Sequence, residues 1–202
     1  MAGVPEYRAG EKFARHRSCR VFPPTSDKNG TAIWPPGQSL LHVYVTVDPR
    51  AHPGLAHLVD GCRQALAGWP LGWVDDAWLH LTVEQLTDVP AAQYTPEEVT
   101  ALVQALTGEL TEVSAFELLV GSALAYPTGV IMDVWPDEPM RDLYTRVRRV
   151  VGQVRGPRTL AYPWSPPHLT LGYATGQADS DQAQRLLRRV RPSHARLPVT
   201  GV

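Results

Sequence analysis

The chain has little of what marks several classes of protein. Its two cysteines, Cys19 and Cys62, lack the Cys-x-x-Cys spacing, so we expect neither a disulfide scaffold nor a cysteine zinc site. No apolar run approaches the roughly 18 residues of a membrane helix, and the N-terminal stretch lacks the apolar segment of a secretory signal. These absences predict a cytoplasmic protein with no membrane partner.

Motifs for cofactors are also missing. The sequence contains neither the Gly-x-x-x-x-Gly-Lys-Ser/Thr loop that cradles a nucleoside triphosphate nor the Gly-x-Gly-x-x-Gly fingerprint of dinucleotide folds. Five histidines form no His-x-His or His-x-x-x-His pair that could begin a zinc site. They are His16, His42, His52, His57 and His194. We therefore expect no metal and no other cofactor.

Lysine is scarce, and every basic residue after Lys28 is an arginine. Residues 1–140 hold 8 Lys and Arg against 17 acids, whereas residues 141–202 hold 11 Arg against 3 acids. Guanidinium groups match phosphate in a bidentate fork, so this asymmetry suggests an anionic partner. The alternative is that the arginines cover solvated helix faces. Those in question are Arg146, Arg148, Arg149, Arg185, Arg188 and Arg189.

The length of 202 residues and a hydrophobic fraction of 44% are sufficient for a buried core. Residues 1–38 contain five prolines and no helical period, which predicts an irregular N-terminal arm. We expect residues 39–202 to form a single bilobal domain with interleaved lobes. A monomer is the default assumption.

Hydrophobic periodicity predicts alternating strands and helices in this domain. Strands are expected at 40–47, 78–86, 116–120, 129–135 and 168–174, with one more near the C-terminus. Helices are expected at 52–68, after a capping box at Thr95 to Glu98, at 137–154, and after an N-cap at Asp179.

The two halves repeat one order of elements: a strand, a helix, a strand containing His-Leu-Thr, and a helix. The two triplets begin at His80 and His168, which are 88 residues apart. This repeat predicts an α+β fold built as a pseudo-two-fold duplication. We expect two antiparallel sheets that face a central cleft, with the helices packed outside.

The repeated triplets carry the chemistry. In each strand the side chains alternate, so the leucines share one face while His80 and Thr82, or His168 and Thr170, share the other. Imidazole titrates near neutral pH, so one histidine can accept a proton while the other donates one. The two hydroxyls are suited to hold the oxygens of a phosphate. The alternative is that both histidines are ordinary strand residues bonded to their own threonines.

His80-Leu81-Thr82-Val83 and His168-Leu169-Thr170-Leu171 resemble the paired motifs of the 2H phosphoesterases, a superfamily that includes 2′-5′ RNA ligase-like proteins and RNA 2′,3′-cyclic phosphodiesterases. The resemblance implies a bilobal α+β fold and metal-independent catalysis. By this resemblance His80 and His168 are catalytic, and Thr82 and Thr170 bind the phosphate. It also implies an RNA end or a small nucleotide with a cyclic phosphate as the partner.

The same resemblance leaves the substrate open, because Gly172-Tyr173 follows the second motif where many members have an arginine. Three functions therefore remain: opening cyclic phosphates on RNA ends, with the related 2′-5′ ligation; the same chemistry on a small nucleotide-derived metabolite; or binding of a nucleotide or RNA without turnover.

Four further residues near the motifs have alternative roles. Tyr44 and Trp164 could stack on a substrate base, although packing is the commoner role of such aromatic residues. Alternation places Glu84 on the face of His80, where it could orient an imidazole. The same rule places Tyr173 with the core leucines.

Overall fold

The computed structural model describes residues 39–201, and the expected arm at 1–38 lies outside this range. The strands and α-helices, in chain order, are β1 (Leu41–Thr46), α2 (Pro53–Ala65), β2 (Leu71–Trp73), β3 (His80–Leu86), α3 (Pro96–Leu110), β4 (Phe116–Tyr126), β5 (Gly129–Trp135), α4 (Asp137–Arg155), β6 (His168–Ala174), α5 (Ser180–Leu187) and β7 (Ala195–Val199). Four short 3₁₀ turns connect them, of which η2 (Asp76–Trp78) precedes β3 directly. The α+β class predicted from the sequence is confirmed. The short strand β2 was not predicted.

The strands form one antiparallel sheet of seven strands in place of the two sheets expected. Their order is β1-β3-β6-β5-β4-β7. The short strand β2 pairs with the last three residues of β6, beyond the pairing of β6 with β3. The two halves join where Leu81 of β3 pairs with Leu169 of β6. This junction satisfies backbone groups that two separate sheets would leave at open edges.

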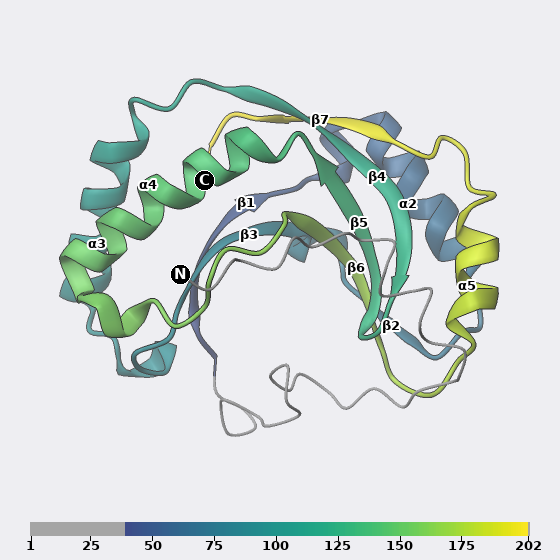
Figure 1. Ribbon diagram of the computed structural model, residues 1–202, viewed down its shortest axis with the longest axis horizontal. Helices are drawn as coiled ribbons and strands as arrows, with labels where there is room; N and C mark the ends of the chain where they lie inside the picture. The colour runs from purple at the N-terminus through teal and green to yellow at the C-terminus, as the bar shows by residue number, and fades with distance from the viewer. Residues whose placement is uncertain (1–38, 202) are drawn as a thin grey trace, which may run out of the picture.

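The sheet is curved, and the four helices α2 to α5 lie outside the curve (Figure 1). Helix α4 packs against β3 and also against α3, while α2 contacts β7 and α5 contacts β4. Each half therefore sends a helix to cover strands of the other half: α2 leaves the first half and α4 leaves the second. No helix among residues 39–201 is both long and apolar enough to cross a membrane.

The apolar stripes predicted from periodicity form the core. In α2, Leu55, Leu58 and Val59 are fully buried, together with Cys62, a free thiol whose pKa is raised by burial to about 12. The capping box of α3 is present, with both of its reciprocal hydrogen bonds. These elements form where sequence spacing and local capping agree.

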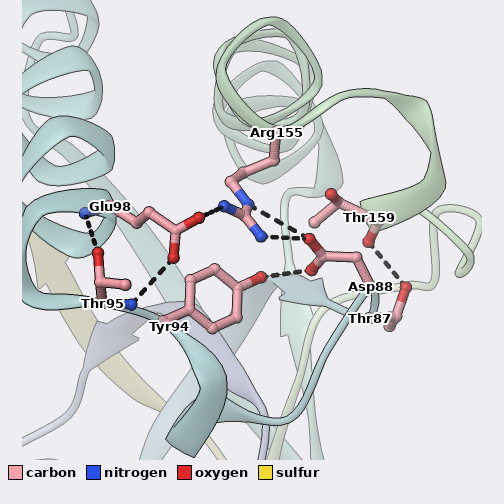
Figure 2. Close-up of polar contacts among 7 residues, drawn as sticks. All are labelled: Thr87, Asp88, Tyr94, Thr95, Glu98, Arg155 and Thr159. Atoms are coloured by element: carbon pink, nitrogen blue, oxygen red, sulfur yellow. Dashed lines mark hydrogen bonds and ion pairs between the residues drawn. The ribbon is translucent and has the colours of Figure 1, made fainter.

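A polar cluster connects the end of α4 to α3 and to the segment after β3 (Figure 2). The Arg155 guanidinium near the end of α4 binds Asp88 after β3 at 2.7 Å and Glu98 of α3 at 2.5 Å, and it lies 4.5 Å from the ring centre of Tyr94. The Tyr94 hydroxyl donates to Asp88. Desolvation of Asp88 is outweighed by the hydrogen bonds from Tyr94 and Arg155, so the pKa of Asp88 is lowered. Desolvation and the nearby Asp88 raise the pKa of Tyr94.

Candidate active site

The two His-Leu-Thr triplets lie on neighbouring strands at the centre of the sheet. Leu81 and Leu169 face the helices and are fully buried. Extending their antiparallel register by one residue in each direction places Thr82 opposite His168 and His80 opposite Thr170. These four residues, the His-Thr quartet, alternate with the buried leucines and so point to the opposite face of the sheet. The helices lie on the leucine side and leave that opposite face uncovered (Figure 1).

The quartet has a local two-fold symmetry that follows from its register. A two-fold axis through the Leu81–Leu169 pair exchanges the two histidines and the two threonines. Cβ atoms of residues directly opposite lie about 5 Å apart, and those on a diagonal about 7–8 Å. That spacing suits one phosphoryl group held by side chains on all sides.

Both imidazoles are anchored in the same way. Nδ1 of His80 lies 2.8 Å from the carbonyl oxygen of Trp78, and Nδ1 of His168 lies 3.0 Å from that of Pro166. A carbonyl oxygen only accepts, so both Nδ1 atoms carry a hydrogen and donate. Each ring therefore keeps Nε2 as the atom that can take up or release a proton toward a ligand.

Local structure sets these anchors. Asp75 caps η2 by accepting from the backbone N–H of Ala77 at 2.9 Å, which fixes the turn that carries the Trp78 carbonyl. Before β6, Pro166 and Pro167 restrict the backbone to extended conformations. His80 is half-buried and His168 is exposed, so solvent reaches both rings.

The surroundings of the two histidines differ. The Tyr44 ring centre lies 4.9 Å from that of His80, and Thr46 pairs with His80 across β1. On the other side Asp133 of β5 pairs with His168. Desolvation lowers the pKa of His42, and repulsion from nearby His80 lowers it further. The quartet is thus symmetric in itself and asymmetric in its neighbours.

Two β-bulges at equivalent positions explain where alternation from the sequence went wrong. In β3 the pairing with β1 shifts across Val83, which turns Glu84 toward the helices; it is 3% exposed. In β6 the pairing with β5 shifts across Leu171, which turns Tyr173 outward; it is 48% exposed. Glu84 therefore cannot orient His80, and Tyr173 is not a core residue. Neither bulge has a signal in the alternating pattern.

Gly172, which follows the second His-Leu-Thr motif, has a packing role. A Cβ atom built on it would lie 3.0 Å from Cε3 of Trp73 and 3.2 Å from the carbonyl oxygen of Gly72. The bulge points this position into the contact between β6 and β2, so a side chain here would require Trp73 or the β2 backbone to shift.

Tyr44 and Trp164, the two predicted stacking residues, lie in different environments. Tyr44 shares the uncovered face with the quartet and contacts His80. Trp164 packs edge-to-face on Tyr144 of α4 at 5.0 Å, and the Arg141 guanidinium lies 5.6 Å from its ring centre. The structure therefore brings Tyr44 to the quartet and places Trp164 against α4.

Arg148 connects β3 to the loop before β6, whereas the sequence analysis offered it only an anionic partner or a solvated helix face. Its Nη1 donates to Oε2 of Glu84 at 2.7 Å and to the carbonyl of Tyr162 at 2.8 Å. Its Nη2 donates to the carbonyl of Leu160 at 2.8 Å. Arg148 thus ties β3 to the segment that leads into His168.

Comparisons with known proteins place this geometry in a family. The model of the 2′-5′ RNA ligase superfamily matches residues 94–202, just over half of the chain, a range that includes the second motif. No curated protein matches the chain.

Two solved structures share the fold. The protein TT0787 of Thermus thermophilus is 19% identical, with a TM-score of 0.56 over 80% of this chain and 85% of that one. A protein described as a phosphoesterase is 17% identical, with a TM-score of 0.52 over 81% of this chain and 84% of that one.

Proposed function

Because the chain belongs to the 2′-5′ RNA ligase superfamily, we propose that it is a metal-independent phosphodiesterase that opens 2′,3′-cyclic phosphate ends of RNA or nucleotides to 2′-phosphates. The same site would join RNA ends when a 5′-hydroxyl takes the place of water. The observation that carries the proposal is the matched pair of imidazoles, each anchored through Nδ1 so that Nε2 can act on a ligand.

The quartet supplies both sides of an in-line displacement. The cyclic phosphate lies between the hydroxyls of Thr82 and Thr170, which donate to its free oxygens. One histidine accepts a proton from water through Nε2 as the water oxygen attacks phosphorus. The bond from phosphorus to the ribose 3′-oxygen breaks, and the other histidine donates its Nε2 proton to that oxygen. The product is a 2′-phosphate with a free 3′-hydroxyl.

After one turnover the two histidines have exchanged protonation states, and solvent resets them, because both rings are accessible. When a 5′-hydroxyl takes the place of water, its oxygen attacks phosphorus, the bond to the 3′-oxygen breaks in the same way, and the product is a 2′-5′ phosphodiester. The rate requires one neutral and one protonated imidazole, so a bell-shaped pH profile is expected.

The test is a panel of 2′,3′-cyclic nucleotides and oligomers ending in a cyclic phosphate, incubated with EDTA and analysed for 2′- against 3′-phosphate products. His80→Ala and His168→Ala should each lower kcat by roughly 10²–10⁴-fold. His57→Ala is the matched control, because His57 is an exposed histidine on α2, away from the quartet.

Each other outcome points elsewhere. Near-normal turnover in either quartet histidine variant would reject the mechanism. Turnover of nucleotides without turnover of oligomers would favour a small-nucleotide enzyme. Binding of either ligand without turnover by the unaltered protein would favour a binding module.

A further inference from the structure

The structure separates two sets among the arginines of the second half, which the sequence alone could not separate. Four arginines of α4 are paired with carboxylates: Arg146 and Arg149 bind Glu109, Arg148 binds Glu84, and Arg155 binds Asp88 and Glu98. These ion pairs hold α4 to its neighbours. These arginines are therefore already neutralised within the fold.

The second group lies on α5 and the loop that follows it. Arg185, Arg188 and Arg189 are exposed and form no ion pair within residues 39–201. The chain has no acidic residue after Asp181 that could neutralise them. This is a basic patch, and its members are Arg185, Arg188, Arg189, Arg191 and His194.

A pocket of about 160 Å³ opens within the basic patch, between α2, the bulge of β4 and the loop from α5 to β7. Its base is apolar, with Leu58 and Leu187 among the lining residues. Its polar lining includes Arg188, Arg191 and Ser122. Figure 1 shows α5 and its loop on the outer side of the sheet, away from the uncovered face.

Arg191, one of the arginines that line the pocket, is held in place by hydrogen bonds. Nη1 of Arg191 donates to the carbonyls of Arg188 at 2.9 Å and Val190 at 2.7 Å. These bonds fix the guanidinium against the end of α5 and leave Nε and Nη2 unbonded within residues 39–201. A guanidinium held in this way loses less conformational freedom when it binds an anion.

Building on the proposed function, we propose that this pocket and the basic patch form a second RNA contact, which binds the sugar-phosphate backbone of the strand whose end reacts at the quartet. Phosphate oxygens pair with Arg188 and Arg191 and with the Ser122 hydroxyl, and the apolar base receives ribose. RNA fits better than a mononucleotide because the pocket and the quartet lie on opposite faces of the sheet. A chain of nucleotides can reach both.

The experiment measures binding separately from catalysis. A fluorescent single-stranded RNA of roughly ten nucleotides ending in a 2′-phosphate, the proposed product, is titrated by anisotropy at several salt concentrations. Arg188→Ser should weaken binding about threefold to tenfold and lower the slope of log K against log salt by about 0.7. The control is Arg158→Ser, which removes an exposed arginine in η4 (Pro157–Thr159), a turn that packs near α4 and not near α5.

Arg188 makes no side-chain hydrogen bond within residues 39–201, so this variant should fold, whereas a change at Arg191 removes two bonds. Turnover of a 2′,3′-cyclic mononucleotide should be unchanged in Arg188→Ser, while KM for a cyclic-phosphate oligomer should rise by the same factor as Kd. Equal effects of Arg188→Ser and Arg158→Ser on RNA binding would overturn the proposal. Binding of phosphatidylserine vesicles that depends on Arg188, without binding of RNA, would also overturn it.

The two proposals fail differently. If cyclic nucleotides are opened but Arg188→Ser binds RNA normally, the proposed function stands and the second contact is wrong. If RNA binds through Arg188 but no cyclic phosphate is opened, the second contact stands and the proposed function is wrong.

Discussion

Arg148 connects β3, α4 and the segment before β6, and its replacement by methionine tests whether that connection holds the second motif in place. Methionine keeps most of the apolar stem and removes the guanidinium. Three hydrogen bonds are lost: one to Glu84 at 2.7 Å and two to the carbonyls of Tyr162 and Leu160 at 2.8 Å. The carboxylate of Glu84 then stays buried without its cation.

The size of the effect follows from burial. The Glu84 side chain is 2% exposed and that of Arg148 is 27% exposed. Removing one partner of a buried ion pair costs about 3–5 kcal/mol, and the partial exposure of Arg148 favours the lower value. We expect Arg148→Met to lower the free energy of unfolding by about 3 kcal/mol near neutral pH. The control Arg146→Met breaks a more exposed pair with Glu109 and should cost about 1 kcal/mol or less.

The pH dependence distinguishes a lost ion pair from lost packing. Burial raises the pKa of Glu84, and the hydrogen bond and charge of Arg148 partly oppose this. Without Arg148 the pKa rises further. An acid whose folded pKa is raised contributes stability below its unfolded pKa, and that contribution is lost as pH rises through the folded value. Arg148→Met should therefore recover stability as pH falls from about 7 toward about 5.

The assay is urea denaturation followed by circular dichroism at both pH values, together with kcat on a cyclic nucleotide. The double variant Glu84→Gln/Arg148→Met, which removes the buried charge, should regain part of the lost stability at neutral pH. If Arg148→Met and Arg146→Met destabilise equally at both pH values, the connection between β3 and the segment before β6 contributes no extra stability and the reasoning is refuted.

Two further predictions concern the frame of the site. Gly129→Ala should lower the free energy of unfolding by about 3 kcal/mol or more, because the φ of Gly129 is +151° and the added Cβ would overlap the Gly172 carbonyl oxygen. The control Gly108→Ala, in α3 with open space around it, should stabilise the protein by about 0.5–1 kcal/mol. Thermal unfolding that finds equal stability in the two variants would contradict the contact at Gly129. Asp88→Asn should lower the free energy of unfolding at about pH 6, and this loss should fade as the pH falls below about 4. The reason is that the lowered pKa of Asp88 contributes stability that disappears when the carboxyl is protonated. A stability difference between variant and unaltered protein that is constant with pH would contradict this prediction.

Much of the fold was accessible from the sequence, because local signals and packing agree there. The stripe of α2 and the capping box of α3 predicted their helices, and Pro166-Pro167 marked the start of β6. The strand β2 was missed, since three residues give no period and its pairing partner lies about 100 positions away in the chain.

The candidate site was predictable only in part. Alternation placed His80 and Thr82 on one face correctly up to the bulge at Val83, and failed at Glu84 beyond it. A bulge depends on pairing between distant strands, so a single strand's pattern does not contain it. The anchoring carbonyls of Trp78 and Pro166 were also invisible, because backbone atoms carry no sequence signature.

The packing of α2 against β7 has a consequence for folding during synthesis. Helix α2 is among the first segments described, and its partner β7 is the last strand. During synthesis the apolar face of α2 stays uncovered by β7 until that strand has left the ribosome. Shortening the chain by its final strand would expose that face and the edge of β4 together, so we expect such truncated products to aggregate rather than fold.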